Sequence, residues 1–189
     1  MSKKNFLTDV KTLRKRARQR IGEGAVTSGY SADREKVLKL LNDSLATEIV
    51  CVLRYRRHHF MAKGIQSKSI ADEFLLHSNE EQGHADQLAE RIVQLGGEPD
   101  FSPGSLVSRS HAEYVEGATL LDMINEDLVA ERIAIDSYRD FIQYLGDKDP
   151  TTRRMLEAIL AVEEQHADEL ADLVQDVPAG LKARSRAAK

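Results

Sequence analysis

The chain has 189 residues and a net charge of −4, and 41% of its residues are hydrophobic while only 5% are aromatic. This length can bury one hydrophobic core, and the absence of tryptophan together with only four prolines favours helices over sheets. The single cysteine, Cys51, excludes an intramolecular disulfide framework, and no apolar run approaches the roughly 20 residues of a membrane span. The basic N-terminus lacks the apolar segment of a secretion signal, so a cytoplasmic protein without membrane contact is expected.

Four long helices are predicted from apolar residues that recur at steps of three and four along the chain. Capping residues, glycines and prolines mark their ends, and the fourth helix is expected to stop before Pro178. The expected boundary residues are the N-caps Ser31 and Asp149, the opening residue Ser67, and the closing residues Lys63-Gly64, Gly96-Gly97 and Gly146.

The second and third predicted helices are joined by a long connection, residues 98–117, which contains Pro99, Pro103 and Gly104. Connections between helices are usually much shorter. A helix of about 27 residues is roughly 40 Å long and about 20 extended residues reach roughly 60 Å, so this segment can return along the whole bundle. We therefore predict an all-α fold, a four-helix bundle of ferritin-like topology with one long crossover between helices two and three.

Each predicted helix carries polar residues inside its apolar stripe. The first and third each have one glutamate at a stripe position, and the second and fourth each have a Glu-x-x-His motif there. Several buried carboxylates repel one another or take up protons unless something compensates their charge, and a pair of divalent cations does so. The six candidate metal ligands are Glu48, Glu81, His84, Glu131, Glu163 and His166.

Glutamate oxygens and neutral imidazole nitrogens suit iron or manganese, and this set matches the ligands of four-helix di-iron carboxylate proteins. Residues i and i+3 lie one above the other on a helix, so one side chain of each motif can bridge two metals while the next caps one. The expected assignment is Glu48 and His84 on one metal, Glu131 and His166 on the other, and Glu81 and Glu163 as bridges.

The two halves of the chain are similar to each other. Glu-x6-Tyr occurs from Glu48 to Tyr55 and again from Glu131 to Tyr138, and the string EEQGHADQL at 80–88 is echoed by EEQHADEL at 163–170. The sequence therefore indicates a duplicated helical hairpin.

The runs LATEIVCVLRY, NEEQGHADQLAERIVQLGGEP, DLVAERIAIDSYRDFI and ILAVEEQHADELADL resemble bacterioferritins and the Dps-like mini-ferritins that share their intra-subunit di-iron centre. The resemblance covers about 140 residues and all six ligand positions. It implies a ferroxidase that oxidises Fe(II) with O2 or H2O2 and stores the ferric product in a hollow shell. Two iron ions per subunit are implied, with manganese or zinc as substitutes. Tyr55 falls where the family keeps a tyrosine near the metals, although an ordinary core aromatic is the alternative.

The sequence departs from the haem-binding, 24-subunit members of that family. Gln82 follows Glu81 where they carry the haem-ligating methionine, so haem is not expected. After the fourth helix only residues 178–189 remain, too few for the fifth helix of the large shells. A homo-oligomeric cage of twelve subunits is therefore favoured over one of 24.

Positive charge is concentrated at the two ends. Residues 1–20 carry a net +7 and residues 181–189 carry +4, which leaves −15 on the rest of the chain. We expect a basic extension at 1–30, the bundle at 31–177 and a basic tail at 178–189. Basic tails suit DNA backbones, and the resemblance implies DNA protection, although solvated tails, or an N-terminal helix docked on a neighbouring subunit, are alternatives.

Three functions are consistent with these features. The leading interpretation is an iron-storage ferroxidase. The second is a di-metal peroxidase or manganese catalase-like oxidoreductase without storage, because the same ligands suit manganese. The third is a nucleoid-binding protein in which metal chemistry is secondary.

Overall fold

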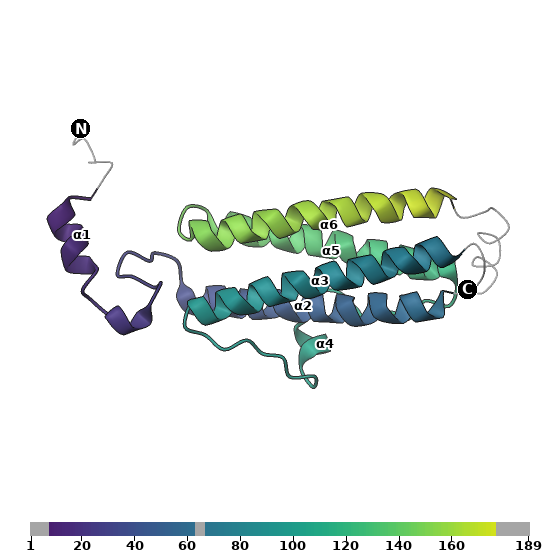
Figure 1. Cartoon of the computed structure of the whole chain (residues 1–189), viewed down its shortest axis with the longest axis horizontal. Coiled ribbons are helices and arrows are strands. Elements are labelled where there is room, and N and C mark those ends of the chain that lie inside the picture. Colours follow the sequence, from purple (N-terminus) through teal and green to yellow (C-terminus); the bar gives the residue numbers. More distant parts are fainter. Residues whose placement is uncertain (1–7, 63–66, 177–189) are drawn as a thin grey trace.

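The computed structural model describes residues 8–62 and 67–176, and within these ranges the chain is helical with no β-strand (Figure 1). The elements in chain order are α1 (Val10–Arg16), the 3-10 turn η1 (Ile21–Glu23), α2 (Arg34–Met61), α3 (Lys68–Gln94), α4 (Leu106–Arg109), α5 (Leu120–Leu145) and α6 (Pro150–Asp176). No helix of this part of the chain is both long and apolar enough to cross a membrane.

Four of these helices form the bundle. Helix α2 packs along α3 and α5 packs along α6, so the molecule consists of two helical hairpins laid side by side (Figure 1). The connection from α3 to α5 passes over α2, where α4 buries Leu106 against Ala46 and Val50. The predicted four-helix bundle with one long crossover is confirmed.

Helix α2 begins two residues later than its predicted N-cap implies. Asp33 is the N-cap, and its side chain accepts a hydrogen bond from the backbone N–H of Lys36 at 3.1 Å. Ser31 was therefore the wrong cap: its hydroxyl lies 3.4 Å from the carbonyl oxygen of Lys148. At Asp33 the backbone is still extended, with φ −70° and ψ 100°, and the helix begins directly after it, which is the geometry of an N-cap. The expected closure at Lys63-Gly64 lies outside the described residues.

The predicted boundary residues Gly146 and Asp149 of the second hairpin are confirmed. Gly146 ends α5 with a φ of 50°, a conformation that favours glycine, and Asp149 accepts the backbone N–H of Thr152 at the start of α6. Thr119 and Asp122 form a capping box at the start of α5. The short connection 146–149 places α5 and α6 antiparallel (Figure 1).

The two larger apolar clusters of the described residues lie one towards each end of the bundle. One contains Leu41, Leu45, Leu88 and Ile92 among others, and the other is built around residues such as Phe74 and Ile124. Along each long helix the polar stripe residues lie between these apolar parts. Burial of each large aliphatic side chain stabilises the fold by about 1.5–3 kcal/mol, which offsets the cost of the polar middle.

A buried ionic network attaches the crossover to the bundle. Arg54 on α2 donates from Nε to Asp127 Oδ1 on α5 at 2.8 Å and from Nη1 to the carbonyl oxygen of Glu113 at 2.8 Å. His58 lies 2.7 Å from the other oxygen of Asp127 and 3.1 Å from the Glu116 carbonyl oxygen. The side chains of Arg54, His58 and Asp127 are at most 1% exposed, so this network is structural and holds the crossover against α2 and α5.

Candidate metal centre

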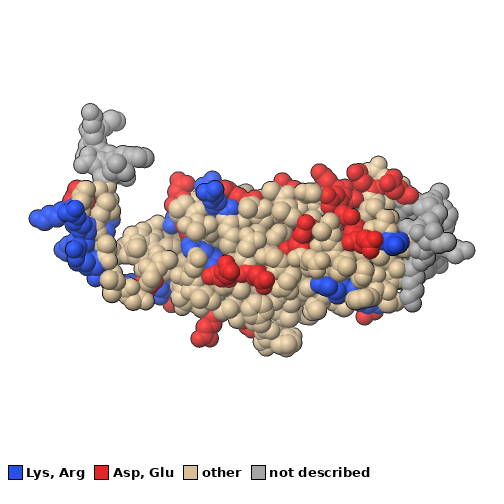
Figure 2. All heavy atoms as spheres, viewed as in Figure 1, with Lys and Arg blue, Asp and Glu red and all other residues tan. Residues whose placement is uncertain are grey.

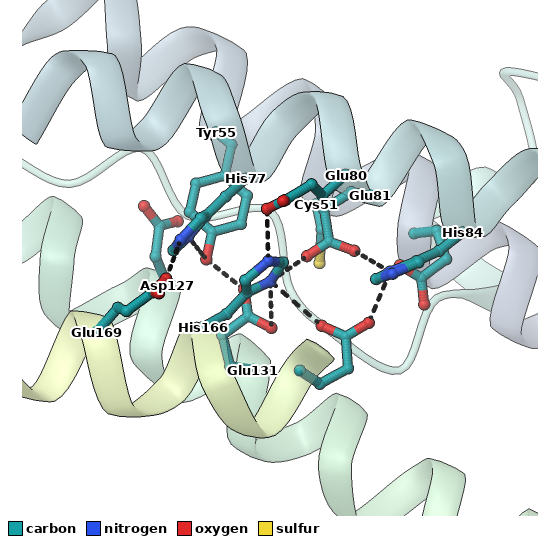
Figure 3. A network of polar contacts seen from close by, with 12 residues as sticks. Cys51, Tyr55, His77, Glu80, Glu81, His84, Asp127, Glu131, His166 and Glu169 are labelled. Atoms are coloured by element: carbon teal, nitrogen blue, oxygen red, sulfur yellow. Dashed lines mark hydrogen bonds and ion pairs between the residues drawn. The ribbon is translucent and has the colours of Figure 1, made fainter. Parts of the chain in front are cut away.

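The structure brings all six predicted ligand residues together in the middle of the bundle. Figure 3 labels four of them, Glu81, His84, Glu131 and His166. Each of the four long helices contributes, and none of the six residues is more than 5% exposed. We call them the central cluster; it comprises Glu48 of α2, Glu81 and His84 of α3, Glu131 of α5, and Glu163 and His166 of α6.

The central cluster consists of two overlapping groups of possible ligands. Each group offers four ligand atoms that lie within 4.8 Å of one another. Glu81 and Glu163 belong to both groups, as expected for carboxylates that bridge two cations. The first group is Glu48, Glu81, His84 and Glu163, and the second is Glu81, Glu131, Glu163 and His166.

The two imidazoles lie at opposite ends of the bridging carboxylates. Nδ1 of His84 is 2.9 Å from Glu163 Oε1 and 3.3 Å from Glu81 Oε2. Nδ1 of His166 is 3.5 Å from Glu81 Oε1 and 3.6 Å from Glu163 Oε2. Each bridging glutamate thus turns one oxygen to each imidazole, which is the division of oxygens that two cations side by side require.

Several buried atoms of the central cluster have no hydrogen-bond partner within the described part of the chain. They are both carboxylate oxygens of Glu163 and Nδ1 of His166. The contact from His84 to Glu163 is short but lacks the alignment of a hydrogen bond. Unsatisfied buried polar atoms are costly, and all three are the kinds of atom that bind divalent cations, so these residues fit a metal pair.

Burial and mutual repulsion disturb the pKa values of this cluster. Burial, reinforced by the charge on Glu81, raises the pKa of Glu48 to about 8. Burial and the charges of Glu81 and Glu163 also raise the pKa of Glu131. Burial alone would lower the pKa of His166, but the Glu163 and Glu81 carboxylates raise it to about 10. Without cations the cluster therefore holds protons, which cations would displace.

The outer nitrogen of His166 is held by a neighbouring carboxylate. Nε2 lies 2.9 Å from Glu80 Oε2, on the adjacent α3, and the Glu80 side chain is 41% exposed. A metal-binding histidine commonly donates its second N–H to such a carboxylate, which fixes the ring and leaves the other nitrogen free for the metal. Glu80 therefore orients His166 with Nδ1 towards the central cluster.

A ferritin-like domain family matches residues 38–179, three quarters of the chain and all six residues of the central cluster. The chain belongs to the ferritin-like family. Among its relatives, the bacterioferritin of Mycobacterium leprae is 31% identical over 136 residues, which are 71% of this chain and 80% of that protein. The "DNA protection during starvation protein" of Pyrococcus furiosus is 30% identical over 153 residues, 78% of this chain and 82% of that protein.

Solved structures of this family share the bundle. The bacterioferritin-related protein of Bacteroides fragilis, a dodecameric thioferritin, superposes with a TM-score of 0.74 at 27% identity, covering 82% of this chain and 91% of that one. The bacterioferritin of Desulfovibrio desulfuricans, which has a di-iron site, gives 0.68 at 25% identity over 78% and 85% of the two chains. Dps from Thermosynechococcus elongatus, at 21% identity and a TM-score of 0.72, shares the fold.

Two tyrosines contact the central cluster, and sequence reasoning selected only one of them. Tyr55 donates a hydrogen bond to Glu131 Oε1, and Tyr138 donates one to Glu48 Oε1. Both phenols are buried, which raises their pKa values and keeps them protonated. Tyr138 could have been found from the same signal as Tyr55, because both stand seven residues after a stripe glutamate.

Proposed function

We propose that this protein oxidises Fe(II) at the central cluster and stores the Fe(III) product inside a shell of identical subunits. The observation that carries the proposal is the pair of overlapping ligand groups that share Glu81 and Glu163. The bacterioferritin and DNA-protection relatives support iron storage as the biological role.

The residues of the central cluster would divide the work as follows. Glu48 and His84 hold one Fe(II), Glu131 and His166 hold the second, and Glu81 and Glu163 contact both. Two Fe(II) substrates held side by side supply two electrons together to O2 or H2O2, so that one-electron reduction of the oxidant is avoided. The carboxylates favour Fe(III) over Fe(II), and the neutral imidazoles limit the accumulated negative charge. Tyr55 and Tyr138 position the terminal glutamates by hydrogen bonds.

Storage requires a closed shell, and we propose one of twelve subunits. The Bacteroides fragilis protein, whose chain this one covers to 91%, is dodecameric. In a closed, symmetric shell each bundle would form part of the wall, so the wall would contain one oxidation site per subunit. Size determination by light scattering tests this number directly, because shells of 12 and 24 subunits differ twofold in mass.

A second role, DNA binding, is favoured by the position of α1. This short helix stands away from the bundle (Figure 1), and Lys and Arg side chains gather on its side away from the bundle, in contrast to the many acidic side chains of the bundle surface (Figure 2). Its last turn contains Arg14, Lys15 and Arg16, all exposed. We propose that these charges bind the DNA backbone and release its counterions. The Pyrococcus furiosus relative is a DNA-protection protein, which agrees with this role.

The strongest competing function is a di-metal peroxidase or manganese catalase-like oxidoreductase that stores nothing. The same ligand groups support it, because carboxylates and imidazoles also suit manganese. The two functions differ in capacity: a storage protein keeps iron in solution far beyond two ions per subunit, whereas a catalytic pair stops at two.

Anaerobic addition of Fe(II) to the apo protein, followed by air or H2O2, distinguishes the two functions. The rate of Fe(II) oxidation and the amount of iron that stays in solution are measured. The matched variant is Glu81→Gln, Glu163→Gln, which keeps side-chain volume but removes both bridges. Rapid oxidation with hundreds of irons retained per assembly, lost in the variant, is the expected result. Retention of two metals per subunit with fast H2O2 turnover would instead identify the catalase-like function.

A further inference from the structure

A second cluster of metal-binding side chains lies beside the central cluster, between α3 and α6. It comprises Glu73 and His77, four residues apart on α3, and Glu169 on α6, and we call it the outer cluster. Nε2 of His77 is 3.0 Å from Glu169 Oε2 and 3.4 Å from Glu73 Oε1. One ligand atom from each of the three residues lies within 4.8 Å of the others.

The outer cluster connects solvent to the central cluster. The Glu73 and Glu169 side chains are 32% and 37% exposed, whereas the His77 side chain is 0% exposed. The His77 ring stacks on the ring of His166 with 4.0 Å between their centroids. Figure 3 shows Glu169, His77 and His166 in succession between α3 and α6. A cation bound by the exposed carboxylates would thus lie next to a ligand of the central cluster.

The two ring nitrogens of His77 have different partners: Nδ1 faces Tyr55, and Nε2 faces the carboxylates of the outer cluster. Tyr55 donates its own proton to Glu131, so the phenol oxygen can only accept from Nδ1–H of His77, 3.3 Å away. A neutral imidazole has one N–H, so Nε2 then directs a lone pair at two carboxylates. A buried lone pair facing negative oxygens is unfavourable, and a divalent cation among the three groups converts that repulsion into coordination.

The internal duplication shows that the fold itself does not require these residues. The motif residues of the two halves, Glu81 and Glu163, are 82 residues apart. The same offset relates the outer cluster to apolar or uncharged residues in the other half. His77 corresponds to Ile159, which is 1% exposed, while Glu73 corresponds to Met155 and Glu169 to Gln87. An isoleucine fills the same core position, so a fully buried histidine on one side only points to a ligand.

We propose that Glu73, His77 and Glu169 bind a third divalent cation, and that Fe(II) occupies this site on its way from solvent to the central cluster. One imidazole and two carboxylates suit Fe(II), Mn(II), Co(II) and Zn(II). Acidic side chains gathered over the C-terminal part of α6 would raise the local cation concentration there (Figure 2). The binding of the cation stands on the outer cluster alone, whereas its passage inward rests on the proposed ferroxidase function.

Co(II) titration of the assembled apo protein without oxygen tests the site, because bound Co(II) is counted from its visible absorption. The wild type is expected to bind three Co(II) per subunit. Glu73→Gln, Glu169→Gln is expected to bind two, and both substitutions are at partly exposed positions that tolerate the change. The control Asp168→Asn, Asp172→Asn neutralises two exposed carboxylates of the same helix and is expected to keep three.

The central variant Glu81→Gln, Glu163→Gln separates this proposal from the ferroxidase proposal. It is expected to keep one Co(II), and that one is expected to disappear when Glu73→Gln and Glu169→Gln are added. If the wild type binds one Co(II) that depends on Glu73 and Glu169, the outer site stands and the central pair fails. An unchanged Co(II) number in Glu73→Gln, Glu169→Gln overturns the outer site, and identifies the contact of His77 with the two carboxylates as an ion pair only.

Stopped-flow measurement of Fe(II) oxidation tests whether Fe(II) passes from the outer cluster to the central cluster. At two Fe(II) per subunit, Glu73→Gln, Glu169→Gln is expected to oxidise Fe(II) at least about tenfold more slowly, because delivery of the cation loses its local negative charge and its ligands. At high Fe(II) concentration the rate is expected to approach that of the wild type. Equal rates at low Fe(II) would show that iron reaches the central cluster by another route.

Discussion

The hydroxyl of Tyr138, on α5, donates a hydrogen bond to Glu48, on α2, across the interface between the two helical hairpins. The converse contact is also present, because Tyr55 of α2 donates to Glu131 of α5. Each helical hairpin therefore supplies a tyrosine that hydrogen-bonds the buried glutamate of the other hairpin. The position of Glu48 and of Glu131 therefore depends on a residue of the opposite hairpin.

Tyr138→Phe is expected to weaken cation binding at the proposed site of Glu48 and His84. Tyr55→Phe is expected to weaken it at the proposed site of Glu131 and His166. Loss of a hydrogen bond to a metal-binding residue typically lowers metal affinity about 10–100-fold. Anaerobic Co(II) titration measures the two affinities. Tyr144→Phe is the control, because the Tyr144 ring packs against Lys36 outside the central cluster. Equal losses in Tyr144→Phe would contradict a specific role for the crossed hydrogen bonds.

The buried network at the crossover predicts a large loss of stability in Asp127→Ala. This substitution leaves Arg54 buried without its carboxylate partner, and breaking such a pair costs about 3–5 kcal/mol. Urea unfolding of the apo protein measures the change. Glu157→Ala removes one of the two carboxylates that pair with Arg153 on the surface and is expected to cost less than about 1 kcal/mol. A cost for Asp127→Ala as small as this surface value would show that the network does not hold the crossover in place.

The raised pKa values of the central cluster predict that the apo protein loses stability as the pH rises. The pKa of Glu48 is raised from 4.5 to about 8, so its contribution is complete below about pH 4.5 and is lost as the pH rises through about 8. His166, with a pKa raised to about 10, acts in the same direction. The Tm of the chelator-treated protein is expected to be roughly 5 °C or more lower at pH 8.5 than at pH 6.

Two further Tm measurements, one with Mn(II) and one on a Glu48→Gln variant, assign the pH dependence to the central cluster. Mn(II) is expected to restore the Tm at pH 8.5, because cations replace the protons that the cluster has lost. The apo Glu48→Gln variant is expected to show a smaller pH dependence, because its amide does not ionise. A Tm that rises with pH in the apo wild type would be inconsistent with these pKa directions.

The basic surface of α1 predicts salt-dependent DNA binding. Substituting Arg14, Lys15 and Arg16 by glutamine is expected to weaken binding of a duplex and to reduce the slope of log K against log salt, by about 0.9 for each phosphate that the protein no longer neutralises. Fluorescence anisotropy at several salt concentrations measures both quantities. Deletion of residues 1–20 is the stronger variant. If a salt-sensitive complex persists unchanged after that deletion, the N-terminal segment does not bind the DNA.

Most of the fold was predictable because the apolar stripes are regular. A glutamate such as Glu48 or Glu131 stands out only against such a stripe, and the duplicated motif fixed which positions belong together. The crossover followed from the length of 98–117. The first cap was wrong because Ser31 and Asp33 are both good N-cap residues, and the choice depends on backbone geometry.

The polar side-chain contacts between helices could not be predicted from the sequence. Asp127 stands three residues after Ile124 and four before Glu131, so helical spacing also allows it to face the core. Nothing in the sequence indicates that its partner is Arg54. Its partner is 73 residues away and becomes visible only when the hairpins are packed. Glu169 likewise occupies an outer position of α6, and only the packing of α6 against α3 brings it to His77.

The most direct test of the central claim is anomalous diffraction from crystals soaked with Fe(II) under anaerobic conditions, recorded at the iron edge. We predict two peaks about 3.5–4 Å apart inside the bundle, both within bonding distance of Glu81 and Glu163. One peak should also contact Glu48 and His84, and the other Glu131 and His166. A single peak, or iron bound only outside these six side chains, would contradict the assignment of a two-iron site.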